Sequence, residues 1–156
     1  MYKRHSFIII LSGIIVFLGA WQLKLSYKVI ASDSMTFVSI AIAVYMAAIA
    51  LPLGDRVSDY MKNQDKHIPT KTHMGVLCAY LKCAVFTGFI SIIISCSVLV
   101  VSNITIEEDN KIEVEKYPLL CDILSAIGFS LFVVNMIFAA IIFKYMFVSM
   151  INNNRN

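Results

Sequence analysis

The chain has 156 residues, of which 59% are hydrophobic and 15% are charged, and its formal net charge is +3. Soluble globular domains have about 45–50% apolar and about 25% charged residues, so this composition excludes an ordinary soluble protein. The longest polar segments have only about twenty residues, which is too short for a second domain with its own core.

Four long stretches carry no charged side chain, and each reaches the roughly 17–25 residues that a helix needs to cross hydrocarbon. Their apolar residues run continuously instead of alternating, which excludes a membrane β-barrel and leaves helices to satisfy the backbone in lipid. We therefore predict an all-α fold, a bundle of four transmembrane helices in up-down-up-down order that forms a homo-oligomer. The predicted spans are 6–26, 34–54, 75–102 and 118–147, with connecting loops at 55–74 and 103–117.

The first span follows a short basic tail and resembles a secretory signal peptide. No small-x-small cleavage site follows the apolar run, which leads directly into Trp21, so we expect the span to be retained. Trp21 and Tyr27 are expected to anchor its far end at the membrane interface, where aromatic side chains are enriched.

Spans two and three carry small residues at helical spacing, and span four carries one carboxamide near its middle. Small side chains let membrane helices approach closely, within one chain or between subunits. The carboxamide, Asn135, needs a partner in hydrocarbon; it could hydrogen-bond across a helix interface or line a polar conduit, and both readings stay open. The small residues are Ser39, Ala43 and Ala47 in span two and Gly88, Ser91 and Ser95 in span three.

The loop between spans two and three is basic. Val57, Tyr60 and Met61 are spaced so that span two is expected to continue beyond the membrane as a short amphipathic stalk. Pro69 ends that stalk, and span three is expected to begin near Thr72.

The cations of this loop have two readings. They fix the topology of the chain, or they bind a soluble cytoplasmic partner protein together with one aromatic residue. The predicted partner-binding residues are Arg56, Tyr60, Lys62, Lys66 and Lys71.

Topology follows from where the Lys and Arg residues gather, because cytoplasmic segments carry the excess. The two terminal segments and the middle loop with its flank hold nine of these cations, and the other two loops hold four. Both termini and loop 55–74 are therefore predicted to be cytoplasmic.

In loop 103–117, apolar residues alternate on both sides of Asp109-Asn110, which fits a short hairpin or an open solvated loop equally well. Pro118 is expected in the first helical turn of span four.

The sequence contains no nucleophile–base pair, phosphate-binding glycine loop or metal-ligand cluster, so we predict no catalytic residue, no cofactor and no metal. The four cysteines form no C-x-x-C pair and are expected to act as small hydrophobic residues. A membrane thiol oxidoreductase would need paired cysteines on the outer side, and the spacing argues against it.

The overall plan of a small chain with four spans, cytoplasmic ends and no enzyme motif resembles the membrane subunit of the Kiwa anti-phage defence system. It is similar in organisation to the membrane half of the Rex exclusion system. The resemblance implies a multi-pass protein of the bacterial inner membrane that senses an infection-linked disturbance and recruits a soluble cytoplasmic effector, without binding nucleic acid itself. The alternative expectation is an oligomeric channel or membrane-depolarising pore.

Overall fold

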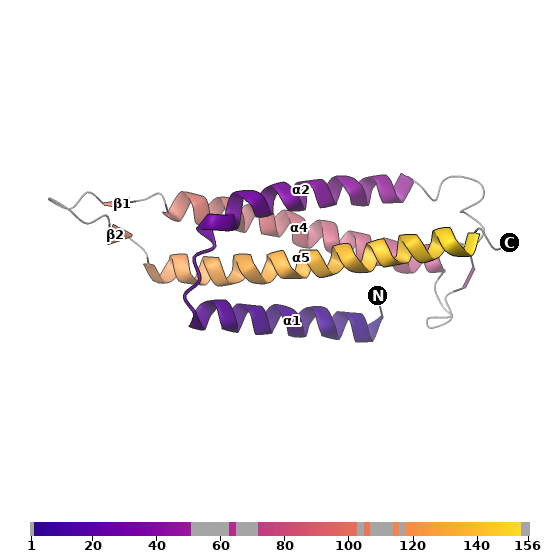
Figure 1. The fold of residues 1–156 in the computed structure, drawn as a ribbon, viewed down its shortest axis with the longest axis horizontal. Coiled ribbons are helices and arrows are strands. Elements are labelled where there is room, and N and C mark those ends of the chain that lie inside the picture. Colours follow the sequence, from indigo (N-terminus) through magenta and orange to yellow (C-terminus); the bar gives the residue numbers. More distant parts are fainter. Residues whose placement is uncertain are drawn as a thin grey trace.

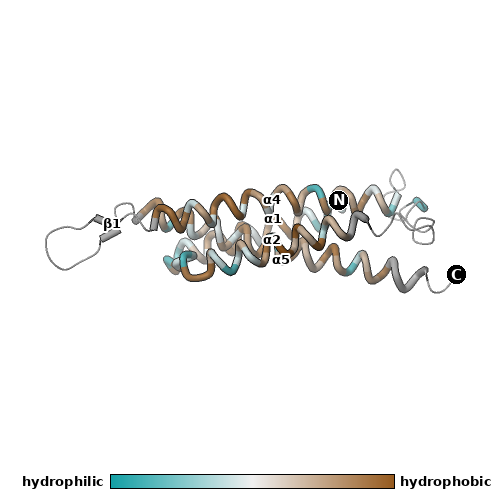
Figure 2. The backbone as a smooth tube through the Cα atoms, turned by 90° about the horizontal axis from the view of Figure 1, so that it is seen from above, coloured by the Kyte–Doolittle hydropathy of each residue, from teal (hydrophilic) through white to brown (hydrophobic). Residues whose placement is uncertain are grey.

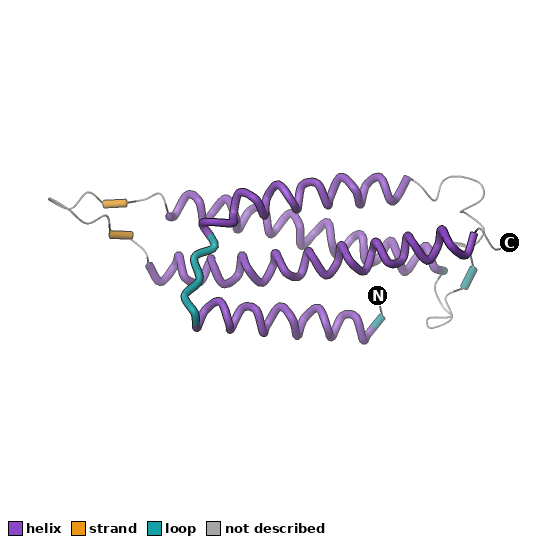
Figure 3. Tube along the Cα trace, viewed as in Figure 1, coloured by secondary structure: helices purple, strands orange, loops and turns teal. Residues whose placement is uncertain are grey.

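Four long helices dominate the computed structural model, which describes residues 2–50, 63–64, 72–102, 105–106, 114–115 and 118–153 (Figures 1 and 3). Two short strands join the last two helices at one end of the molecule. The elements are α1 (Lys3–Gln22), α2 (Lys28–Ala50), α4 (His73–Ser102), β1 (Thr105–Ile106), β2 (Val114–Glu115) and α5 (Pro118–Asn153).

All four helices are long and apolar enough to cross a membrane, which makes the chain a multi-pass membrane protein and confirms the all-α helical bundle. Large apolar side chains cover the outer surfaces of the bundle, among them Phe7, Ile14 and Phe86. Figure 2 shows that hydrophobic residues predominate along the four helices. In lipid, such an exterior needs no further protein cover, because the hydrocarbon solvates it.

Each helix runs antiparallel to the one before it in the chain, but consecutive helices do not always pack against each other. α1 packs on α5, α5 packs on α4, and α4 packs on α2, while α2 touches α5 over a shorter length. α5 therefore lies between α1 and the α2–α4 pair. We call the end that holds the starts of α1 and α4 the N-terminal end, and the end that holds β1 and β2 the hairpin end (Figure 1).

α1 ends at Gln22, four residues before the predicted end of span one, because the chain turns there. Leu25 N–H donates to Ala20 O at 3.1 Å and Lys24 N–H donates to Trp21 O at 3.3 Å. Lys24 adopts a φ of 47°. This pattern is a Schellman motif, whose left-handed position is usually glycine. α2 begins at Lys28, six residues before the predicted start at Ser34. The prediction excluded Lys28 and Asp33 because they are charged, but a helix can include charged residues where it starts near a membrane surface.

The other two helices begin where the sequence indicates. Thr72 caps α4: its Oγ1 accepts a hydrogen bond from Gly75 N–H at 3.2 Å, and its carbonyl accepts one from Val76 N–H at 3.0 Å. α5 begins at Pro118 and continues to Asn153, beyond the predicted end at residue 147. The predicted stalk after span two lies outside the described residues.

The hairpin alternative for loop 103–117 is confirmed. β1 pairs with β2 in antiparallel register, with Thr105 opposite Glu115 and Ile106 opposite Val114. The residue halfway between the paired positions is Asn110, which belongs to the Asp109-Asn110 pair that the alternating apolar residues flank in the sequence.

Candidate functional site

The candidate site is the set of polar and aromatic side chains buried between the helices. Three tyrosines are among the most deeply buried side chains: Tyr27, Tyr45 and Tyr80. A buried tyrosine supplies a large apolar ring and one hydroxyl that needs a partner, and the hydroxyls of Tyr27 and Tyr80 have one.

Tyr27 organises the hairpin end. It was expected at the membrane interface, but it is 0% exposed and sits inside the bundle, so that prediction is wrong; Trp21, by contrast, is 40% exposed. The Tyr27 hydroxyl donates to Ser34 Oγ at 2.5 Å and lies 3.1 Å from Ser95 Oγ. Its backbone N–H donates to Ser125 Oγ at 3.3 Å. One residue between α1 and α2 thereby joins α2, α4 and α5.

Gly128 makes room for the Tyr27 ring. A Cβ atom at position 128 would lie only 2.6 Å from ring atoms Cδ1 and Cε1 of Tyr27. The ring also meets Phe129 edge-on, with the two ring centroids 5.2 Å apart. A side chain at position 128 would overlap the body of the ring, so the position requires a residue without a side chain.

Asn135 lies at the middle of the bundle, buried between α4 and α5. Thr87 Oγ1 on α4 lies 3.3 Å from Asn135 Oδ1, and its one hydrogen is shared between this oxygen and the Cys83 and Ala84 carbonyls at 3.0 and 3.1 Å. Asn135 Nδ2 donates to Leu131 O at 2.9 Å. These contacts place Asn135 in a hydrogen bond across a helix interface, the first of the two roles considered for it.

Ser91 and Tyr45 are the two buried residues whose hydroxyls have no hydrogen-bond partner among the described residues. Ser91 lies on α4 between Thr87 and Ser95, so hydroxyls follow one face of this helix from the hairpin end to its middle. Toward the N-terminal end this face becomes apolar, where Ala84 and Leu81 belong to the same buried apolar cluster as Phe138. The row of hydroxyls therefore does not continue through the bundle.

A second aromatic cluster closes the N-terminal end. The Tyr80 hydroxyl on α4 lies 2.7 Å from His5 Nδ1 and accepts a hydrogen bond from Tyr2 N–H at 3.1 Å. Tyr145 on α5 stacks on Tyr2, with centroids 6.2 Å apart, and lies 5.7 Å from the Tyr80 ring. We call Tyr2, His5, Tyr80 and Tyr145 the N-terminal cluster. It ties the starts of α1 and α4 to the last part of α5.

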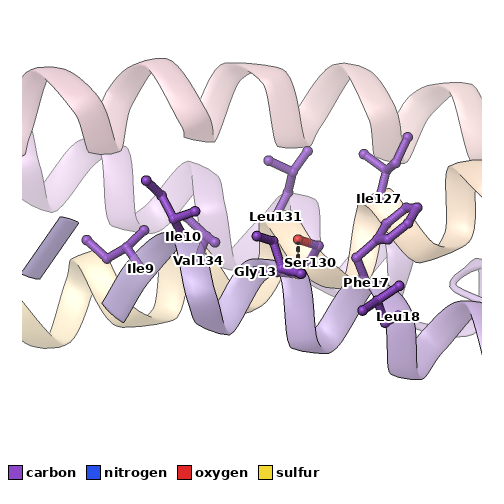
Figure 4. A pocket seen from close by; sticks show the side chains of 10 residues that line it. Ile9, Ile10, Gly13, Phe17, Leu18, Ile127, Ser130, Leu131 and Val134 are labelled. Carbon is purple, nitrogen blue, oxygen red and sulfur yellow. Dashed lines mark hydrogen bonds between the residues drawn. The ribbon is translucent and has the colours of Figure 1, made fainter. Parts of the chain in front are cut away.

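A groove runs along the line where α1 meets α5. Ser130 Oγ donates to Gly13 O at 2.9 Å, and a Cβ at Gly13 would lie 3.3 Å from Val134, so the helices approach closely here. Beside this contact the surface is hollowed by about 440 Å³ (Figure 4). The lining residues are Ile9, Ile10, Gly13, Ile14, Phe17 and Leu18 of α1 with Ile127, Ser130, Leu131 and Val134 of α5.

The structure divides the predicted helix-packing residues into two groups. Gly88, Ser91, Ser95 and Asn135 are buried, and a Cβ at Gly88 would lie 3.1 Å from Ile42, so Gly88 marks the crossing of α2 and α4. The three small residues of α2 are exposed and face away from the other helices of the chain: Ser39, Ala43 and Ala47. The predicted partner-binding residues Arg56, Tyr60, Lys62, Lys66 and Lys71 lie outside the described residues.

The four cysteines are free thiols. Cys83 and Cys96 are exposed, Cys121 is buried, and Cys78 is half-buried. Cys96 Sγ lies 3.5 Å from Met35 Sδ, a contact between two soft, apolar groups. Within the described ranges, no three His, Cys, Asp or Glu residues gather in a group that could hold a metal.

No protein-family model, no curated protein and no solved structure matches this chain. The structure of this chain shows four apolar helices packed as a bundle.

Sequence reasoning missed the residues that hold the helices together: Tyr27, Gly128, Tyr80, His5 and the Gly13–Ser130 pair. A signal was present for some of them, because Ser125 and Gly128 are small residues three positions apart, which lie on the same face of span four, and small residues on one face let helices approach closely. Tyr27 carried no such signal. It lies between Lys24 and Lys28, where a tyrosine ordinarily points to a membrane surface.

Proposed function

We propose that the chain is a non-enzymatic membrane sensor or anchor of the bacterial inner membrane that recruits a soluble cytoplasmic effector in anti-phage defence. The observation that carries the proposal is the N-terminal cluster. It links three helices at the end from which loop 55–74 and the C-terminal segment emerge, so a shift of any of these helices in the bilayer changes the geometry of that end.

The charge distribution supports the same orientation. Four of the described cations belong to the N-terminal end (Lys3, Arg4, Lys82 and Lys144) and two to the hairpin end (Lys24 and Lys28). The described acidic residues, Asp33, Glu115 and Asp122, all belong to the hairpin-end part of the molecule. Cations favour the cytoplasmic side, which supports a cytoplasmic location for the N-terminal end and loop 55–74. The effector would then bind the cationic loop, near the C-terminal end of α5.

Reversing three loop charges, Arg56, Lys62 and Lys66, to glutamate tests the docking surface. With the chain expressed beside its flanking genes, the membrane-bound fraction of a tagged soluble flanking product is expected to fall by about tenfold or more, because like-charge pairing opposes binding. Phage plating efficiency should rise in parallel. The matched control reverses Lys24, Lys111 and Lys116 on the other side and should change neither quantity. Equal membrane binding in the two triple variants would contradict the proposal.

The exposed small-residue face of α2 is the surface that a homo-oligomer would use. Ser39, Ala43 and Ala47 repeat every four residues on one side of the helix, and their small side chains allow a second helix to approach the backbone closely.

An oligomeric channel is the second candidate, and the unpartnered hydroxyl of Ser91 is the observation that favours it.

Replacement of Asn135 by leucine distinguishes the sensor from the channel. Under the sensor proposal, ion flux into liposomes should be at background with and without the substitution, and stability should fall by about 0.5–2 kcal/mol through loss of the Thr87 bond. Thr36→Val, on the exposed face of α2, is the control and should change neither. Flux in the wild type that Asn135→Leu abolishes would favour the pore.

A further inference from the structure

His5 is a hydrogen-bond partner of Tyr80 in the N-terminal cluster, and the contacts around it fit a neutral imidazole ring. Its Nδ1 lies 2.7 Å from the Tyr80 hydroxyl, whose oxygen also accepts the Tyr2 N–H at 3.1 Å. With Nδ1 unprotonated, the Tyr80 O–H donates to it, so the hydroxyl gives its hydrogen to one neighbour and accepts from the other. A proton on Nδ1 places a second N–H against the same oxygen and turns the hydroxyl hydrogen away from His5.

The surroundings of the ring oppose a positive charge. The Tyr2 and Tyr80 rings lie 5.4 and 5.9 Å from the imidazole, and Tyr80 is fully buried, so water solvates this side of the ring poorly. Arg4 on α1 and Lys144 on α5 act on the ring electrostatically, and both repel a cation. The phenols of Tyr80 and Tyr145 are neutral at the pH where an imidazole titrates. The described charged residues of the N-terminal end are all cations: Lys3, Arg4, Lys82 and Lys144.

His5 lies where protons from water can reach it, and where losing its bond affects one part of the bundle. It precedes the charge-free stretch that begins at Ser6, is only half-buried and follows the exposed Arg4. Its bond to Tyr80 ties the first turn of α1 to α4, and the stacking of Tyr2 on Tyr145 ties the same turn to α5. Loss of the bond therefore loosens the start of α1.

We infer that the N-terminal cluster is a proton-operated latch: protonation of His5 breaks its bond with Tyr80 and releases the start of α1 from α4. An unperturbed imidazole titrates near about pH 6.5, so the latch is closed in neutral solution and opens in acid. The latch depends only on the cluster. Where the chain works as a sensor, entry of protons through a damaged membrane becomes the disturbance that it detects, and this last step rests on the proposed function.

The experiment follows amide hydrogen exchange in the first turns of α1, with the purified full chain in lipid nanodiscs, from about pH 8 to about pH 5. Each rate is expressed as a protection factor, because the intrinsic rate of exchange itself depends on pH. The wild type should lose protection by about fivefold or more in acid, the loss expected when its hydrogen bonds to Tyr80 break. Amides around Asn135 in the middle of α5 are the internal reference and should keep their protection.

Three variants assign the effect to His5. His5→Gln cannot titrate, but its carboxamide oxygen can still accept the Tyr80 O–H, so its protection should be the same at both ends of the pH range. His73→Gln is the matched control, because it removes another histidine at the same end, and it should respond as the wild type does. Arg4→Gln combined with Lys144→Gln should move the midpoint of the loss to higher pH, because fewer cations then oppose the charge.

Equal protection of the wild type at the two ends of the pH range would overturn the inference, and so would a loss of protection in His5→Gln equal to that of the wild type. Greater protection in acid would also overturn it, because the tyrosine rings would then hold the imidazolium in place. If His5→Gln does not fold, nuclear magnetic resonance of the wild type decides: the titration of the His5 ring and the loss of protection must have the same midpoint. No effector is present in these samples, so a failure of effector recruitment leaves the result unchanged.

Discussion

Replacing Gly128 by alanine is expected to destabilise the bundle by about 1–3 kcal/mol or more, the usual range for overpacking in a filled core. The added Cβ would lie 2.6 Å from two ring atoms of Tyr27. These atoms belong to the body of the ring, which hydrogen bonds to Ser34 and Ser95 hold at one end and Phe129 confines on a side. Relief of the clash must therefore move a whole helix or break the hydroxyl bonds.

Gly19→Ala is the matched control. Gly19 is also in the interior of a membrane helix, but a Cβ there would have nothing within 4 Å. Alanine should be neutral at this position or should stabilise the helix by about 0.5–1 kcal/mol. The measurement is the melting temperature of each variant purified in the same detergent. If Gly128→Ala has the same melting temperature as the wild type, the Tyr27 ring does not occupy the position that the structure gives it.

The sequence predicts the number of helices and where α4 and α5 begin, because these features depend on local signals. Length without charge sets a membrane span, Thr72 supplies a cap, and Pro118 fits the first turn. The hairpin between β1 and β2 also follows a local alternation of apolar residues. Helix ends were predicted less well at the α1–α2 connection, since a charge-free stretch marks the hydrocarbon and not the helix.

The contacts between helices could not be predicted in the same way. Tyr27 and Trp21 have the same kind of surroundings in the sequence, yet one is buried and the other is exposed. What separates them is Gly128, which lies 101 positions after Tyr27 in the chain. Likewise, the small residues of α2 and α4 have similar spacing, but Gly88 faces a helix of the same chain while Ala43 faces outward. Spacing identifies a face, and only the arrangement of α2, α4 and α5 determines what covers it.

Replacing Tyr80 by alanine is expected to loosen the N-terminal end, because this side chain joins three helices. Tyr80 is 0% exposed, and removal of a buried aromatic ring costs about 3–5 kcal/mol. The Tyr2 N–H and His5 Nδ1 also lose their common partner. The expected result is a lower melting temperature together with fast amide hydrogen exchange in the first turns of α1.

Two phenylalanine substitutions separate the hydroxyl from the ring. Tyr80→Phe keeps the ring contacts with Tyr145 but removes both hydrogen bonds, so exchange near Tyr2 should rise by roughly fivefold, the equivalent of about 1 kcal/mol. Tyr45→Phe is the control: its hydroxyl is buried without a partner among the described residues, so its removal should be neutral or stabilising. If Tyr80→Phe exchanges as slowly as Tyr45→Phe, the cluster does not hold the start of α1. A shift of helix packing would then have no route through Tyr80 to the end of the bundle where the effector is proposed to bind.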